Sequence, residues 1–283
     1  MSQIIYLNGK YLNRDDAKIS IMDRGFLFGD GVYELIPIYR SKPFLINKHL
    51  QRLKSSLELV GMSGDSGVIE SLEEIMLELI SKNKYIDHFF YVHITRGYQP
   101  SRNHVYPKDI EPTVLVMGEE YKVFPKEKLE NGFKGCVRED FRWMKSNIKS
   151  ISLLGNVMLK NYAAQNGFYE TLLVRNKKLT EGSASNIFVV KKGQVMTPNL
   201  GVEILPGVTR DLLIELFRNN NIEVQETDVT EDDLLSSEEV WCTSSTNYCV
   251  PITEIDNKKI GNGKVGNYSY RSYDLITKFI SAL

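Results

Sequence analysis

The chain has 283 residues, which exceeds one average domain and predicts two domains or one large one. Its 42% hydrophobic and 10% aromatic residues are enough to bury a sizeable core, which excludes a disordered chain or a fibre. The 35 basic and 36 acidic side chains leave a net charge of -1, so no field of one sign favours nucleic acid or an acidic membrane surface as a partner. The 3 cysteines form no CxxC pair, which disfavours structural zinc and suits thiols kept reduced in a cytosol.

The N-terminal segment lacks the apolar run of a signal peptide, because only residues 4–7 are apolar before the Asn8-Gly9 turn. No other stretch approaches the roughly 18 apolar residues of a membrane-spanning helix. We therefore expect a cytoplasmic protein with no membrane partner.

The first half of the chain predicts an α+β domain. Asn8-Gly9 suits a tight hairpin turn, and Pro37 inside a strand-like run predicts an edge or bulged position. Asn47 is the expected N-cap of a helix, and apolar residues that alternate over 90–95 indicate a strand with two different faces. The expected elements are a hairpin over 4–12, a strand over 31–39, helices over 47–60 and 69–81, and strands over 90–95 and 113–117.

A polar stretch without periodicity over 119–129, which contains Pro125, is the expected connection between domains. We place a smaller N-terminal α+β domain at 1–120, a linker at 121–128 and a larger, β-rich C-terminal domain with helices at 129–283. Gly167 is expected to end the first helix of that domain. The expected elements are helices over 155–166 and 209–219, and strands over 168–174, 187–190, 222–229 and 240–242.

Most familiar catalytic signatures are absent from the sequence, among them GxxxxGK[ST], HExxH and GxSxG. Ser146 and Lys149 match SxxK, but the partner motifs of penicillin-recognising enzymes are missing. With only 4 histidines, most of them in ordinary helix or strand patterns, we expect no metal site.

Two short segments suit a phosphate. Gly207 forms a turn into an amphipathic helix, so the amides of Val208 and Thr209 and the hydroxyl of Thr209 are expected at a helix N-terminus. Residues 243–246 place consecutive hydroxyls at a strand end. Each pattern is also typical of an ordinary helix cap or a solvated loop, so taken alone neither identifies a site.

Four motifs in this order resemble the class IV, fold-type IV aminotransferases, which use pyridoxal 5'-phosphate. The resemblance extends over about residues 4–265 and, within the class, is strongest to the D-amino-acid transaminases. It implies an α/β (α+β) fold of two domains. The motifs are Asp23–Glu34, Asn147–Ser150 followed by Leu153-Leu154, Thr180–Asn186, and Gly207–Arg210.

The resemblance implies that Lys149 forms the Schiff base with the cofactor and then moves the substrate proton, a choice that the residues alone leave open among Lys145, Lys149 and Lys160. It implies that Glu181 pairs with the pyridine nitrogen and keeps it protonated, so that the ring withdraws electrons. The implied contacts to the phosphate are Arg52, Val208, Thr209, Ser244 and Ser245; Arg142 is implied near the phenolic oxygen, Leu205 against the ring, and Ser185 among the cofactor-binding residues.

The same resemblance places Tyr33 in the substrate pocket and makes Arg102 and His104 a carboxylate trap contributed by the neighbouring subunit of a homodimer. A guanidinium fork binds a carboxylate through two hydrogen bonds, which fixes the face of the substrate and therefore its enantiomer. The implied reaction transfers an amino group between amino acid and 2-oxo acid by a ping-pong route, from D-alanine to 2-oxoglutarate, giving pyruvate and D-glutamate. Without the resemblance, Arg52 and Arg102 are ordinary solvated arginines and Tyr33 is core.

Alternatives remain within the family and outside it. Branched-chain L-amino-acid aminotransferases carry a glycine and an arginine that Tyr33–Pro37 lacks, and aminodeoxychorismate lyases differ over Tyr98–His104. A protein that binds pyridoxal phosphate without turnover would leave Tyr33, Arg102 and His104 without a role. A third alternative is a protein that uses no cofactor at all. Ala184, where the family often has serine, and Asn247–Cys249 in the expected pocket wall leave cofactor affinity and side-chain preference open.

Overall fold

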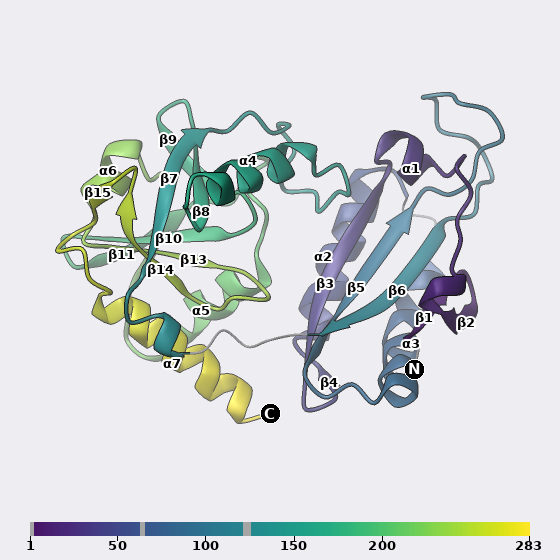
Figure 1. Cartoon of the computed structure of the whole chain (residues 1–283), viewed down its shortest axis with the longest axis horizontal. Coiled ribbons are helices and arrows are strands. Elements are labelled where there is room, and N and C mark those ends of the chain that lie inside the picture. The colour runs from purple at the N-terminus through teal and green to yellow at the C-terminus, as the bar shows by residue number, and fades with distance from the viewer. Residues whose placement is uncertain (1–2, 63–65, 121–125) are drawn as a thin grey trace. The chain divides into compact units, whose positions relative to one another are not determined.

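A computed structural model describes residues 3–62, 66–120 and 126–283 (Figure 1). It divides the chain into two compact units, one of Met1–Lys122 with Ile148–Leu153 and the other of Val123–Asn147 with Leu154–Leu283. Residues 121–125 of the predicted linker lie outside the described residues. The segment Ile148–Leu153, which we assigned to the second domain, instead belongs to the first unit.

The first unit contains a six-stranded antiparallel sheet in the order β2-β1-β6-β5-β3-β4 (Figure 1). Asn8 and Gly9 both take positive φ, as the hairpin between β1 and β2 requires. The strands are β1 Ile4–Leu7, β2 Lys10–Asn13, β3 Gly31–Tyr39, β4 Lys42–Pro43, β5 His88–Thr95 and β6 Thr113–Glu120.

Helices α2 (Ile46–Leu59) and α3 (Ser66–Asn83) pack against this sheet, α2 on β3 and α3 on β1 and β6. Phe90, Val92 and Ile94 of β5 are buried in the core between sheet and helices, which confirms the predicted alternation. The shorter elements are η1 Arg14–Asp16 and α1 Arg24–Phe28.

The predicted N-cap of α2 is wrong. The helix begins at Ile46, and its N-cap is Leu45, whose φ of 48° lies in the left-handed region. The Leu45 carbonyl accepts from the amides of Lys48 and His49, so the helical hydrogen bonds start before the Asn47 side chain can cap them.

The side of β3 that faces away from β5 explains how the strand accommodates Pro37. β5 pairs with β3 along its length, whereas β4 pairs only with Ile38 and Tyr39 on the opposite side. The carbonyl of Pro37 faces that opposite side, where it accepts from the amide of Phe44 at 2.7 Å. Since the nitrogen of a strand residue faces the same way as its carbonyl, the missing N–H removes no bond to β5.

The second unit contains a nine-stranded mixed sheet in the order β12-β11-β10-β13-β14-β7-β8-β9, with β15 paired to β14. The sheet curls, because β9 at its end also contacts β10 and β11. The strands are β7 Phe133–Glu139, β8 Glu170–Arg175, β9 Lys178–Gly182, β10 Asn186–Lys191, β11 Gln194–Pro198, β12 Val224–Thr227, β13 Glu239–Thr243, β14 Val250–Ile255 and β15 Lys258–Lys259.

Helices cover this sheet. α4 contacts β8, α7 packs on both α5 and β13, and α6 contacts β9 (Figure 1). Gly167 ends α4 with a φ of +74°, as predicted. The helices are α4 Leu154–Gln165, α5 Val208–Asn219, α6 Glu231–Leu235 and α7 Asn267–Ser281, with η2 at Lys126–Lys128.

Within the described ranges, no helix is long and apolar enough to cross a membrane, and no group of His, Cys, Asp or Glu side chains is arranged to hold a metal ion. The cysteines Cys136, Cys242 and Cys249 are buried thiols.

Replacing Gly97 by alanine should destabilise the first unit strongly. Gly97 has a φ of +103°, and a Cβ there would overlap the carbonyl oxygen of Glu111, which belongs to rigid backbone. Gly9 is a matched control, since its φ is +84° and no atom lies within 4 Å of an added Cβ. We expect Gly9→Ala to cost about 1 kcal/mol of unfolding free energy and Gly97→Ala about 1–3 kcal/mol more, measured by urea denaturation. Equal losses would show that the overlap is absent.

Candidate functional site

Lys149 and Tyr33 are brought together in the first unit. The Lys149 carbonyl accepts from the amide of Tyr33 at 2.9 Å, and the Lys149 amide donates to Ser56 Oγ at 3.2 Å. These bonds fix the backbone, and Lys149 Nζ lies 4.1 Å from the centroid of the Tyr33 ring. The other candidate lysines differ, because Lys145 is exposed and Lys160 Nζ donates to the carbonyl of Tyr169 at 2.6 Å.

Arg52 of α2 is buried rather than solvated. Its Nε and Nη2 donate to the two carboxylate oxygens of Glu34 at 2.9 and 2.6 Å, and His49 Nδ1 lies 3.1 Å from the same carboxylate. Burial alone would raise the pKa of Glu34, but Arg52 and His49 outweigh it and hold that pKa well below its usual range. The guanidinium is therefore oriented by β3, which carries Tyr33 next to Glu34.

Arg102 and His104 lie together at the surface of the first unit. Both are exposed and both contact the ring of Phe28, the guanidinium at 5.1 Å and the imidazole at 5.1 Å between centroids. Tyr33 contacts Tyr91 instead, with ring centroids 5.7 Å apart.

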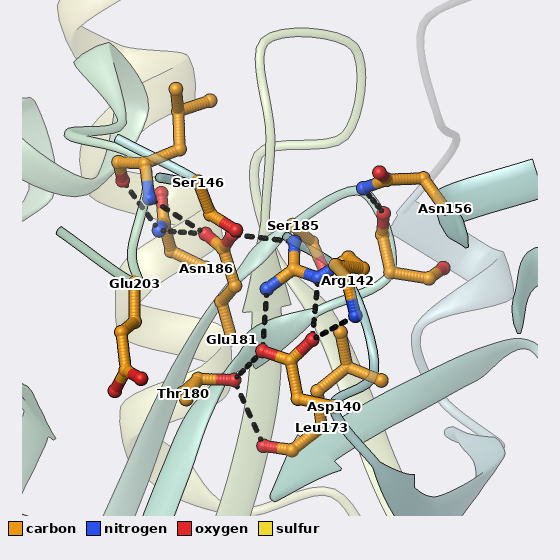
Figure 2. A network of polar contacts seen from close by, with 12 residues as sticks. Asp140, Arg142, Ser146, Asn156, Leu173, Thr180, Glu181, Ser185, Asn186 and Glu203 are labelled. Atoms are coloured by element: carbon orange, nitrogen blue, oxygen red, sulfur yellow. Dashed lines mark hydrogen bonds and ion pairs between the residues drawn. The ribbon is translucent and has the colours of Figure 1, made fainter. Parts of the chain in front are cut away.

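Glu181 is the centre of a buried polar network in the second unit (Figure 2). Arg142 Nη1 donates to Glu181 Oε1 at 2.7 Å, while Arg142 Nε and Nη2 donate to the two oxygens of Asp140, each at 2.9 Å. Glu181 Oε2 accepts from Asn186 Nδ2 at 3.2 Å and from the Leu205 amide at 3.1 Å. Arg142, predicted near a phenolic oxygen, therefore lies against the carboxylates, and its contact with the cofactor stays a prediction.

Arg142 neutralises the negative charge of Glu181 only in part. Burial raises the pKa of Glu181 to about 7, and Arg142 opposes the rise incompletely because it also serves Asp140. The pKa of Asp140 is lowered despite its burial, since Arg142 and Arg175 both bind it. A further cation placed next to Glu181 would therefore lower the pKa of Glu181 and stabilise its ionised form.

Asn186 connects Glu181 to the predicted phosphate seat, a role that we did not predict from the sequence. It pairs with Thr243 across β10 and β13, and its amide also donates to the Leu205 carbonyl at 3.0 Å. A Cβ on Gly207, the N-cap of α5, would overlap Asn186 Oδ1. The helix N-terminus and the hydroxyl run therefore lie beside Asn186, and only its place inside the Thr180–Asn186 motif hinted at this role.

The predicted phosphate seat has two parts. α5 begins at Val208, both Val208 and Thr209 are buried, and the N-cap Gly207 offers no side chain to the first amides. The turn after β13 is closed by reciprocal backbone hydrogen bonds between Ser244 and Asn247. The hydroxyl of Thr243 is buried and has no hydrogen-bond partner among the described residues.

Ser185 is engaged elsewhere. Its hydroxyl donates to Glu170 Oε2 at 2.9 Å, and Glu170 also accepts from Ser183. Leu205 contributes its backbone, with its amide on Glu181 and its carbonyl on Asn186. The structure gives Ser185 a structural partner, and its contact with a cofactor stays a prediction.

Replacing Glu181 by glutamine should remove a pH dependence from the stability of the protein without cofactor. The folded pKa of about 7 exceeds the ordinary value of 4.5, so the folded state holds this proton more tightly and loses stability as the pH rises between the two values. The unfolding free energy of Glu181→Gln relative to the unmodified chain should increase by roughly 2–3 kcal/mol from pH 5 to 8.

Glu226→Gln is the control for this measurement. Arg210 and Arg218 lower the pKa of Glu226 against its partial burial, so this carboxyl titrates below the range tested. Its stability difference from the unmodified chain should stay constant from pH 5 to 8. Parallel pH profiles for Glu181→Gln and the unmodified chain would contradict the raised pKa.

Known proteins resemble this chain along most of its length. The sequence profile of the family described as Amino-transferase class IV matches residues 31–255. The D-alanine aminotransferase of Staphylococcus epidermidis is 34% identical over 98% of both chains, and that of Listeria monocytogenes is 36% identical over 93% of this chain and 91% of its own.

Solved structures share the fold. The branched-chain amino acid aminotransferase of Escherichia coli superposes with a TM-score of 0.89 at 25% identity, over 99% of this chain and 95% of its own. A T.th. branched-chain amino acid aminotransferase, solved with pyridoxamine 5'-phosphate, gives a TM-score of 0.91 at 23% identity, over 100% of this chain and 95% of its own. The expected fold-type IV architecture is confirmed, and the chain belongs to the class IV aminotransferases.

Proposed function

We propose that this aminotransferase uses pyridoxal 5'-phosphate to transfer the amino group of D-alanine to 2-oxoglutarate, giving pyruvate and D-glutamate. The observation that carries the choice of a D-amino acid is the pair Arg102 and His104, exposed together against Phe28. The near full-length identity to D-alanine aminotransferases supports the same choice.

The residues of the second unit fit such a cofactor. The buried hydroxyl of Thr243 lacks a partner among the described residues, and the amides of Val208 and Thr209 begin a helix whose N-cap has no side chain, so together they suit a phosphate. Glu181 is buried, ionisable and incompletely neutralised, which suits a protonated pyridine nitrogen. Thr209, Ser244 and Ser245 supply further hydroxyls to the phosphate in this proposal. Arg52, which belongs to the first unit, is the proposed guanidinium.

When bound, pyridoxal phosphate supplies an electron sink for the carbanion formed at the substrate Cα. Lys149 would hold the cofactor through Nζ. Once the substrate amine takes the place of Nζ there, the free Lys149 amine would move the proton of the substrate Cα. Tyr33, in contact with Nζ, orients the amine, and the hydrogen bond from Tyr33 N to the Lys149 carbonyl limits the motion of its backbone. Glu181, held by Arg142 and Asn186, maintains the positive charge of the ring.

The partner copy in a homodimer supplies Arg102 and His104 in this proposal. A guanidinium binds both oxygens of a carboxylate, and the imidazole beside it adds a donor, so the α-carboxylate is fixed while the amino group faces Lys149. The branched-chain enzymes share the fold with this chain, but Pro37 stands in the run where their arginine is expected. A proline offers no donor to a carboxylate.

Stereochemistry of turnover tests the substrate class. With pyridoxal phosphate and 2-oxoglutarate, the purified protein should form pyruvate from D-alanine. Pyruvate formation is measured through its coupled enzymatic reduction. Arg102→Ala should lower kcat/KM for D-alanine by about 10- to 100-fold, because a charge-assisted hydrogen bond to the carboxylate is lost. Turnover of L-leucine but not D-alanine, unaffected by Arg102→Ala, would move the protein to the branched-chain activity.

Replacing Lys149 by alanine should reduce the transamination rate by about 10²- to 10⁴-fold, the usual contribution of a positioned proton-transfer group. Lys145→Ala is the matched control, since Lys145 is a nearby but exposed lysine, and its rate should equal that of the unmodified enzyme. An active Lys149→Ala variant beside an inactive Lys145→Ala variant would show that the amine was assigned to the wrong lysine.

A further inference from the structure

Arg24 is a buried arginine whose side chain holds the loop that carries Arg102 and His104. It lies on α1 with only 2% of its surface exposed. Its Nη1 donates to the carbonyl of Asn103 at 2.6 Å, and its Nη2 donates to the carbonyl of His104 at 3.2 Å. Nη1 also donates to the side chain of Gln99 at the start of the loop. Residues 99–105 are called the Arg102 loop below.

Arg24 forms an ion pair with Asp30. Asp30 Oδ2 accepts from Arg24 Nε at 2.7 Å and from Arg96 Nε at 2.9 Å, so one carboxylate serves two guanidinium groups. Arg96 donates its other hydrogen bonds to the carbonyls of Val60 and Gly61, outside the Arg102 loop. The positive charge left over on Arg24 is therefore stabilised by the loop carbonyls, and a buried charge without such partners would be costly.

One aromatic ring joins Arg24 to both trap residues. The Arg24 guanidinium lies 4.9 Å from the Phe28 centroid, and Arg102 and His104 each lie 5.1 Å from the same ring. The two residues whose carbonyls accept from Arg24, Asn103 and His104, follow Arg102 directly in the chain, so these bonds fix the backbone from which the Arg102 side chain extends. Exposed loops without such anchors populate several conformations.

We infer that Arg24 is the positioning residue of the carboxylate trap, an inference that rests on the proposed D-amino-acid activity. Arg24 itself touches no reacting atom. Its fork of donors holds the Arg102 loop in one conformation, so that the Arg102 guanidinium and the His104 imidazole meet the substrate carboxylate together. Charge alone does not suffice, because a lysine ammonium has no planar fork to reach Asp30 and two loop carbonyls at once.

The test compares Arg24→Met, Arg24→Lys and Arg102→Ala with the double variant Arg24→Met/Arg102→Ala in the holoenzyme. We expect Arg24→Met to raise KM for D-alanine by about 10- to 100-fold, as displaced binding groups do, with kcat changed much less. Arg24→Lys should behave similarly. In the Arg102→Ala background, Arg24→Met should change KM less than about twofold, because the group it positions is already gone.

Hydrogen exchange of the amides of the Arg102 loop gives a readout that does not depend on turnover. Exchange over 99–105 should become faster in Arg24→Met and stay near the unmodified rate in Arg96→Lys, since Arg96 bonds Asp30 but donates to Val60 and Gly61. Arg96→Lys should also raise KM several times less than Arg24→Met.

The outcomes separate the two claims. Two outcomes would overturn the role of Arg24 and leave the proposed function standing. In the first, Arg24→Met turns over D-alanine with an unchanged KM. In the second, the effects of Arg24→Met and Arg102→Ala on KM are additive. No D-alanine turnover by the unmodified enzyme would overturn the proposed function, and the trap assigned to Arg24 with it. If Arg24→Met raised KM but Arg24→Lys had the KM of the unmodified enzyme, the requirement for a guanidinium would be overturned.

Discussion

The pairing of a short later segment of the chain with the edge of β3 is the constraint on which the position of Lys149 depends. The Tyr33 amide donates to the carbonyl of Lys149, and the amide of Ile151 donates to the carbonyl of Gly31, so Ile148–Leu153 extends along the edge that the short β4 leaves available. At Gly31 this segment also packs closely, since a Cβ there would lie 3.0 Å from the Ile151 side chain. The position of Nζ beside Tyr33 follows from backbone hydrogen bonds rather than from the lysine side chain itself.

Buried arginines then orient the acidic side chains in both units. Arg52 binds Glu34, Arg142 binds Asp140 and Glu181, and Arg24 binds Asp30. Burying such pairs contributes little net stability, because desolvation offsets much of the attraction, but removal of one partner leaves an expensive unpaired charge. The pairs therefore hold their carboxylates in single orientations. Glu181 is the exception. Its negative charge is only partly neutralised, because Arg142 pairs with both Asp140 and Glu181.

Much of the fold could be predicted from local patterns. The Asn8-Gly9 turn, the alternation in β5, the start of α5 and the Gly167 cap each depend on residues close in sequence. Several elements missing from the prediction had weaker local signals: β9 is short, β7 and β14 pair with each other in parallel although they lie far apart in the chain, and α7 is rich in tyrosine and serine. Those elements form because the sheet around them buries their faces.

The residues of the candidate site also divide into those that sequence motifs indicate and those that depend on contacts between distant parts of the chain. Motif order led to the roles proposed for Lys149 and Glu181, whose neighbours in sequence carry the family pattern. Arg24 and Asn186 lie inside the same motifs but act through residues far away in the chain, Arg24 on 103–104 and Asn186 on Leu205 and Thr243. No spacing rule reports such contacts, and only the folded backbone brings them together.

Borohydride reduction of the enzyme with bound pyridoxal phosphate, followed by peptide mass spectrometry, tests the central claim most directly. Reduction fixes the phosphopyridoxyl group on the lysine that holds it. We predict this mass on the peptide containing Lys149, at Lys149 itself. Modification of Lys145 or Lys160 with Lys149 unmodified would contradict it.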